Sequence, residues 1–330
     1  MNTAAAAPGR SFRRLPEDIM NIGLPEELLH LEAVRSLHQG LGRLYPEVRW
    51  HHSQPRRSEA PEVIISEGDA CFPFKKTIRT SCSLAGRADA LLVPRLVRLD
   101  GYLMCPNFRG LPDLVALNLE RSSSEPRRPP LISPLIDEQG PGGRRGSLKQ
   151  AMEALSGTLG LEPQLDPALA LTEASNPEDQ STACPGKGCI ALLGHPYMLG
   201  DKRLNSRIPE IIRSRGYRTI TPESVPFARL DRLASERDYY AKTLYWRFAR
   251  ETLGGYIYFS REQPVSGIIF LVSFNCGLDA LLRVELAALH RRSEQPVPLL
   301  THVSDEHTQQ EHVVTRIEAF LDILDGLPHA

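Results

Sequence analysis

The stretch Gly267-Ile268-Ile269-Phe270-Leu271-Val272-Ser273-Phe274-Asn275-Cys276-Gly277 decides the fold class of this 330-residue chain. Residues 267–274 form a nearly continuous apolar run, which is typical of a parallel strand covered by helices on both faces. Residues 277–292 then carry leucine and valine at helical spacing. A strand, a turn with a cysteine and a helix follow one another directly, and this order predicts an α/β fold.

The same alternation of strands and helices extends along the rest of the chain. Strands are predicted at 20–24, 63–66, 90–93, 189–193 and 299–303, and helices at 26–44, 208–215, 230–253 and 310–324. Such alternation implies parallel sheets whose strands are joined by crossover helices. We therefore expect an α/β protein with two Rossmann-like parallel-sheet domains that face a cleft and are joined by an irregular linker.

The composition along the chain predicts the domain boundaries. Residues 1–17 are rich in alanine and arginine and are expected to form a disordered tail. The N-terminal α/β domain is predicted at 18–121 and the C-terminal α/β domain at 187–330. Residues 122–186 are rich in serine, proline, arginine and glycine, so we expect a linker with one short helix behind a capping box at Ser147.

The overall composition excludes several classes of protein. The hydrophobic fraction of 41% and the charged fraction of 24% are those of a soluble globular protein. The formal net charge of −1 gives no general attraction for nucleic acid or for an anionic membrane. No apolar run is long enough to span a bilayer and no secretory signal is recognisable. We expect a cytoplasmic protein without nucleic-acid or membrane partners.

Three of the six cysteines lie where a predicted strand gives way to a turn: Cys71, Cys105 and Cys276. Such positions lie at the ligand-binding edge of an open α/β sheet, and a thiol at a helix N-terminus has a lowered pKa. Three thiolates suffice to hold a four-iron cluster in which one iron stays open. Clusters that serve only electron transfer usually have four thiolate ligands. Zinc sites usually contain C-x-x-C pairs, and none occurs here. From spacing alone, buried thiols, a catalytic thiol and metal ligands all remain possible interpretations.

The other cysteines and one histidine have competing interpretations. Cys82 is expected to be a packed thiol on a helix, and Cys184 and Cys189 are expected to be structural, with a redox-labile pair as the alternative. His195, in Gly194-His195-Pro196-Tyr197, is a candidate catalytic residue that donates a hydrogen bond to a metal ligand or protonates a leaving group. The alternative is a turn histidine satisfied by the backbone.

Several motifs, taken in order, resemble those of one family. They are Ile22–Pro25 with Leu28, Gly68–Lys75, Pro94-Arg95, Cys105–Asp113, Gly194–Tyr197, Leu244–Trp246, Ser273–Gly277, Asp305–Thr308 and Thr315–Asp322. Together they resemble the uncharacterised CoA-enzyme-activase-associated proteins, relatives of the 2-hydroxyglutaryl-CoA dehydratase subunits and of the double-cubane cluster proteins. The resemblance runs from about Ile22 to Leu324 and excludes the linker.

The resemblance implies that Cys71, Cys105 and Cys276 hold an oxygen-sensitive iron–sulfur cluster, either 4Fe-4S or double-cubane. It also implies low-potential electron transfer driven by a separate ATP-dependent activase protein. In dehydratase relatives, one electron converts a 2-hydroxyacyl-CoA thioester into a ketyl radical that loses hydroxide, whereas double-cubane relatives reduce small molecules. Leu278 departs from the family pattern, because many members have proline there. We expect neither an ATPase module nor ATP binding in this chain, which lacks the motif G-x-x-x-x-G-K-[ST].

The charged residues near these motifs can be interpreted either as functional residues or as ordinary surface residues. Lys75 and Arg95 are candidates to offset the charge of a cluster or of CoA, and solvated surface charge is the alternative. Asp305, Glu306 and His307 are expected to form an exposed helix-capping turn, with support of a cluster ligand as the alternative.

Three functions remain open. The first is an iron–sulfur dehydratase or reductase subunit, expected to form a homo- or hetero-dimer. The second is a non-catalytic cluster carrier, or an activation or assembly partner of a dehydratase. The third is an α/β protein that has lost its cluster.

Overall fold

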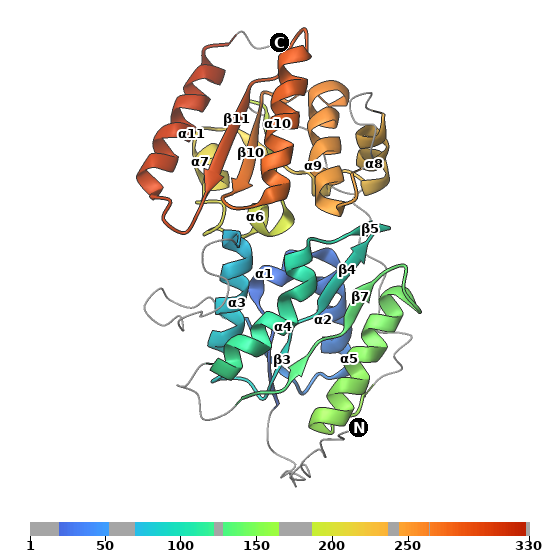
Figure 1. The fold of residues 1–330 in the computed structure, drawn as a ribbon. Coiled ribbons are helices and arrows are strands. Elements are labelled where there is room, and N and C mark those ends of the chain that lie inside the picture. Colours follow the sequence, from blue (N-terminus) through green and yellow to red (C-terminus); the bar gives the residue numbers. More distant parts are fainter. Residues whose placement is uncertain are drawn as a thin grey trace.

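Two parallel four-stranded sheets organise the chain in the computed structural model, which describes residues 20–52, 70–121, 128–164, 187–236, 244–263 and 265–327. One sheet belongs to the N-terminal half and the other to the C-terminal half, and the halves lie one above the other in Figure 1. This arrangement confirms the α/β class with Rossmann-like parallel sheets.

The N-terminal half surrounds the sheet β2-β1-β3-β6, in which all neighbouring strands are parallel. A smaller sheet, β5-β4-β7, has one antiparallel and one parallel pair. The elements of this half are β1 (Asn21–Gly23), α1 (Glu26–Leu29), α2 (Glu32–Leu44), β2 (Arg49–His51), α3 (Phe72–Leu84), β3 (Ala90–Leu92), β4 (Arg95–Leu99), β5 (Tyr102–Leu103), α4 (Pro106–Arg121), β6 (Leu131–Ile132), β7 (Leu135–Asp137) and α5 (Gly143–Leu159).

The C-terminal half surrounds the parallel sheet β11-β10-β8-β9. Its elements are β8 (Cys189–Leu193), α6 (Pro196–Gly200), α7 (Ile208–Ser214), β9 (Arg218–Ile220), the 3₁₀ turn Pro222–Ser224, α8 (Phe227–Ser235), α9 (Arg247–Ile257), the π-helical turn Tyr258–Glu262, β10 (Gly267–Ser273), α10 (Gly277–Arg292), β11 (Leu299–Ser304) and α11 (Gln310–Asp325). Alternate residues of β8 and β10 point to opposite faces of the sheet. One face packs on α8, α9 and α10 and the other on α7 and α11.

The strands and helices predicted at 20–24, 90–93, 189–193, 267–274, 277–292 and 310–324 are confirmed. The strand predicted at 63–66 and the tail at 1–17 lie outside the described residues. A single helix over 230–253 is wrong, because α8 and α9 are separate. The segment before α9 is held extended, since the Leu103 amide donates to the Tyr245 carbonyl and Leu103 pairs with Trp246.

Much of the predicted irregular linker is regular structure. Strand β6 pairs with β3, β7 pairs with β4, and α5 packs on α2. The predicted capping box is also wrong: α5 begins at Gly143 behind Gly142, and the Ser147 hydroxyl donates to the Leu135 carbonyl at 2.6 Å. Strands β6 and β7 have only two and three residues, which is too short for a period to be visible in the sequence.

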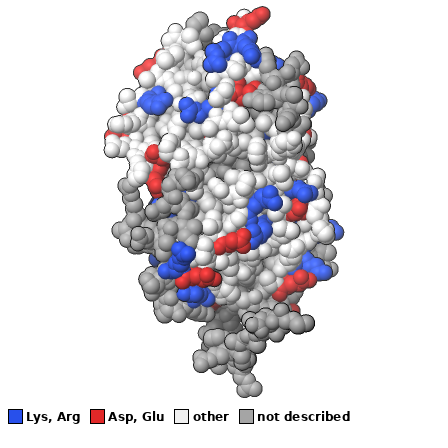
Figure 2. Space-filling view, in the orientation of Figure 1, with Lys and Arg blue, Asp and Glu red and all other residues white. Residues whose placement is uncertain are grey.

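Charged side chains of both signs are interspersed on the face shown in Figure 2, without a broad area of one sign. Within the residues that the structure describes, no helix combines the length and the apolar character needed to cross a membrane.

The crossing of α8 and α9 depends on a glycine. A Cβ atom at Gly254 would lie 2.1 Å from the Leu230 carbonyl oxygen, whereas one at Gly157 in α5 would meet nothing within 4 Å. We expect Gly254→Ala to lower the free energy of unfolding by about 1–3 kcal/mol through overpacking. The matched Gly157→Ala should raise it by about 0.5–1 kcal/mol through helix propensity. Urea denaturation measures both, and equal stability of the two variants would contradict this packing.

Candidate functional site

Three cysteines stand at the N-termini of three helices. Cys71 caps α3 and Cys276 caps α10, while Cys105 directly precedes α4. Cys71 and Cys105 come from the N-terminal half and Cys276 from the C-terminal half. The positive end of a helix macrodipole favours a thiolate at each of these positions.

The structure brings these three residues together at the junction of the two halves. Cys71 belongs to the apolar core of the N-terminal half, and Cys105 and Cys276 pack against the same core. Each sulfur also lies near amides of its own helix. Cys71 is close to the Phe74 amide, Cys105 to the Asn107 and Phe108 amides, and the Asp279 amide donates to the Cys276 sulfur at 3.5 Å.

Burial raises the pKa of all three thiols. The pKa of Cys71 rises to about 12, and a charge on Cys105 would raise it further. Burial also raises the pKa of Cys276, and charges on Asp279, Cys71 and Cys105 act in the same direction. The thiols therefore lie within electrostatic reach of one another. Without a cation they are protonated near neutral pH, so metal binding at this position would release protons.

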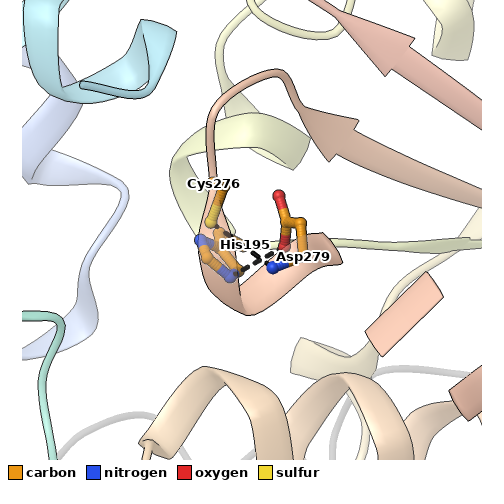
Figure 3. Close-up of side chains that lie close together, drawn as sticks. All are labelled: His195, Cys276 and Asp279. Carbon is orange, nitrogen blue, oxygen red and sulfur yellow. Dashed lines mark hydrogen bonds and ion pairs between the residues drawn. The ribbon is translucent and has the colours of Figure 1, made fainter. Parts of the chain in front are cut away.

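His195 lies beside Cys276 and a buried acid, Asp279 (Figure 3). The His195 Nε2 atom lies 3.2 Å from Asp279 Oδ1, and its Nδ1 atom is hydrogen-bonded to the Tyr197 hydroxyl. Asp279 also accepts the Ser273 amide at 2.8 Å. Ligand atoms of His195, Cys276 and Asp279 lie within 4.8 Å of one another. A mixed nitrogen, sulfur and oxygen set of this kind suits a transition-metal ion.

Asp279 was missed by the sequence analysis. Its only sequence signal is an acid three residues after Cys276, which is the spacing of a first-turn helix residue behind its cap. The His195 side chain is only 2% exposed and contacts Tyr197 and Asp279 rather than only the backbone, which was the alternative interpretation. A catalytic role for His195 stays a prediction.

Aromatic rings surround this group of polar residues. Tyr197 stacks on Phe108 with ring centroids 5.2 Å apart, and Phe248 lies 5.1 Å from the His195 ring. Burial raises the pKa of the Tyr197 hydroxyl well above its usual value, and charges on the three cysteines would raise it further. Around Tyr197 and His195 the site is buried, so electrostatic interactions there are stronger than in water.

Ion pairs join the two halves at two places, one on α3 and one near β5. These two elements lie on opposite sides of the junction in Figure 1. On the α3 side, Lys76 pairs with Asp201, which follows α6, and lies 2.8 Å from a carboxylate oxygen of Glu27 in α1. All three side chains are almost fully buried. On the β5 side, Arg247 Nε lies 2.6 Å from Asp100 Oδ2. Because a buried charge without its partner is costly, these pairs disfavour separation of the halves.

The remaining predicted residues lie apart from the thiols or act in other contacts. Cys82 is a buried thiol inside α3, as expected, and Cys189 is disulfide-bonded. Cys184 lies outside the described residues. Arg95 pairs with Asp113 at 2.6 Å on the surface, so its charge is already engaged by a carboxylate.

The turn at Asp305–His307 contacts the other half of the molecule. Asp305 accepts the His307 amide at 2.8 Å and the Thr308 hydroxyl at 2.9 Å, so these residues form a turn. The expected helix cap is wrong, because α11 begins behind Gln309 and has no side-chain cap. Glu306, however, reaches across to α3, where it pairs with Lys75 at 3.1 Å and with Arg79 at 2.7 Å. The sequence did not reveal this contact.

Residues 21–225, more than half of the chain, match the family described as CoA enzyme activase uncharacterised domain (DUF2229). The chain belongs to this family. The match confirms the family that the motifs resemble, while the link to 2-hydroxyacyl-CoA dehydratases stays a prediction. The matched region of the chain contains Cys71, Cys105 and His195, whereas Cys276 lies beyond it. No curated protein matches the chain.

Asp279 should be essential for the packing around Cys276. We expect Asp279→Ala to lower the free energy of unfolding by about 1–3 kcal/mol, because the buried Ser273 amide loses its acceptor. The matched variant is Asp305→Ala, which removes an acid from a partly exposed turn and should cost less. Thermal unfolding of both variants measures the difference, and a smaller loss for Asp279→Ala would refute this role.

Proposed function

We propose that Cys71, Cys105 and Cys276 hold an iron–sulfur cluster and that the chain serves low-potential electron transfer. The cluster is of the 4Fe-4S or double-cubane type and is sensitive to oxygen. The observation that supports the proposal is that three thiols, from both halves and from three helix N-termini, pack on one apolar core within electrostatic reach of one another. When bound, the cluster supplies one-electron chemistry at low potential.

The donor set fits such a cluster better than a single zinc ion. Ligand atoms of one zinc ion lie about 4 Å apart. Among the residues that the structure describes, the close set of possible ligands is His195, Cys276 and Asp279, and it includes neither Cys71 nor Cys105. A four-iron cluster binds each cysteine through a different iron atom, so its thiolates are spaced more widely.

The surrounding residues match the needs of an anionic cluster. Amides in the first turns of α3, α4 and α10 face the three sulfur atoms and offset negative charge without adding a cation. The stacked rings of Phe108 and Tyr197 add buried apolar surface beside the thiols. His195 lies beside Cys276, with its ring nitrogens directed at Asp279 and at the Tyr197 hydroxyl.

Two roles follow from such a cluster. The first is a dehydratase or reductase subunit that acts on a CoA thioester or a small molecule. The second is a non-catalytic carrier or an activation partner of a dehydratase, and the almost complete burial of Cys71, 5% exposed, favours it. An electron can cross a few ångströms of protein to reach a buried cluster, whereas a substrate has to contact the iron directly. Burial therefore hinders the enzyme role more than the carrier role.

Replacement of any one of the three cysteines should abolish stable cluster binding. We expect Cys71→Ser, Cys105→Ser and Cys276→Ser to lower cluster affinity at least about tenfold after anaerobic reconstitution. Cys82→Ser is the matched control, because Cys82 is buried in the same helix as the capping residue Cys71 and should leave the iron and sulfide content unchanged. Equal iron per chain in the control and the three variants would refute the assignment.

An activase partner is part of the proposal, and its support is the family description, CoA enzyme activase. We expect the pure chain not to hydrolyse ATP, since its sequence contains no G-x-x-x-x-G-K-[ST] phosphate-binding motif. An anaerobic assay with ATP and a mild electron donor, first without and then with a cognate activase, measures ATP turnover and cluster reduction. ATP turnover by the chain alone, or equal reduction without the activase, would contradict this dependence.

A further inference from the structure

The C-terminal half contains a set of three metal-ligand side chains of its own: His195, Cys276 and Asp279. His195 follows β8 at the start of α6, whereas Cys276 and Asp279 belong to the first turn of α10 (Figure 3). Their ligand atoms lie within 4.8 Å of one another. The set shares Cys276 with the three cysteines assigned to the cluster, but it takes no ligand from the N-terminal half.

Two of these ligand atoms are buried without a hydrogen-bond partner. The side chains of His195 and Asp279 are 2% and 0% exposed. Among the residues that the structure describes, neither His195 Nε2 nor Asp279 Oδ1 has a hydrogen-bond partner, although the two atoms lie only 3.2 Å apart. A buried polar atom without a partner costs about 1–3 kcal/mol. A cation bound between the two atoms would satisfy both of them.

The other polar atoms of these side chains are held in place by neighbours. The second ring nitrogen of His195, Nδ1, is hydrogen-bonded to the Tyr197 hydroxyl. Asp279 Oδ2 accepts the Ser273 amide at 2.8 Å, and the Asp279 amide donates to the Cys276 sulfur at 3.5 Å. Histidine ligands of metals almost always have their second nitrogen in such a hydrogen bond, which fixes the ring and leaves the lone pair on the other nitrogen.

The spacing and the charge of the set suit a divalent transition-metal ion. Metal–ligand bonds of about 2.0–2.1 Å place two tetrahedral ligands about 3.3 Å apart, close to the distance between His195 Nε2 and Asp279 Oδ1. A thiolate and a carboxylate together carry two negative charges, which a divalent cation neutralises in this buried place. Nitrogen and sulfur ligands favour zinc and similar ions, whereas magnesium and calcium prefer oxygen ligands.

We propose that the chain without its cluster binds one zinc ion through His195 Nε2, Cys276 Sγ and Asp279 Oδ1. Three protein ligands leave the fourth position of a tetrahedral ion to water. Because a Cys276 thiolate bound to zinc is not available to iron, the zinc ion and the cluster exclude each other, and zinc regulates cluster loading. The zinc site itself is independent of the proposed function, and only the mutual exclusion rests on it.

Anaerobic titration of the cluster-free full chain with Co²⁺, followed by displacement with Zn²⁺, tests the site. We expect one Co²⁺ per chain, with the strong visible bands of a four-coordinate ion and a sulfur-to-metal charge-transfer band. Asp279→Asn should weaken binding at least about tenfold, because asparagine can still accept the Ser273 amide but places an amide nitrogen without a lone pair at Oδ1. Asp305→Asn changes an acid outside the set in the same way and should bind Co²⁺ as the wild type does.

The cysteine variants separate the zinc site from the cluster. Cys71→Ser and Cys105→Ser should lose the cluster and keep the cobalt bands, whereas Cys276→Ser should lose both. Unchanged Co²⁺ affinity in Asp279→Asn, or a loss in Cys71→Ser as large as in Cys276→Ser, would overturn the zinc site. Should Asp279→Asn not fold, Tyr197→Phe removes the partner of His195 Nδ1 and should weaken Co²⁺ binding about tenfold.

Cluster loading of the zinc-bound wild type tests the mutual exclusion. One equivalent of Zn²⁺ added before anaerobic reconstitution should lower the iron content per chain at least about tenfold, and removal of the zinc with a chelator should restore it. Full iron content with zinc still bound would overturn the exclusion. If the zinc-free wild type takes up no cluster, the proposed function and the exclusion fail, and the cobalt titration alone decides the zinc site.

Discussion

The stack of Tyr197 on Phe108 connects the two halves at their centre, and the arrangement of the site depends on it. The rings lie 5.2 Å apart at 20°, one from each half. Around them, the apolar core of the N-terminal half continues into Met198, Leu204 and Phe248 of the C-terminal half. Neither half alone covers this surface, so docking of the halves completes a hydrophobic core. The same docking brings Cys276 to Cys71 and Cys105.

The three cysteines are negatively charged when they bind a metal, and the buried carboxylate of Asp279 lies beside Cys276. Negative charge in this largely buried site requires compensation. The compensation here is mainly dipolar, since α3, α4 and α10 direct their first-turn amides at the sulfur atoms. The nearby buried cation, Lys76, is already engaged by Glu27 and Asp201. Dipoles fixed by helices need no reorganisation when a charge arrives, whereas a lysine would have to change partners.

Part of this site could be predicted from residues alone. Each cysteine stands where a strand or turn leads into a helix, and such boundaries are set by local features such as apolar runs, glycine and proline. The strand before Cys276 and the helix after it were therefore predicted closely. The helix at 230–253 was predicted wrongly, because pairing of Leu103 with Tyr245 and Trp246 overrides the local pattern. Strand β6, with two residues, carries no detectable period and is defined only by its partner β3.

The sequence by itself determined the fold class, the boundary between strand and helix that holds Cys276, and the family that the motifs resemble. Only the tertiary structure decided that Asp279 contacts His195, that Glu306 reaches α3, and that His195 lies beside Cys276. The physical reason is the range of the interactions. Periodicity reports contacts within a few residues, whereas these contacts form between segments whose separation along the chain leaves no local pattern.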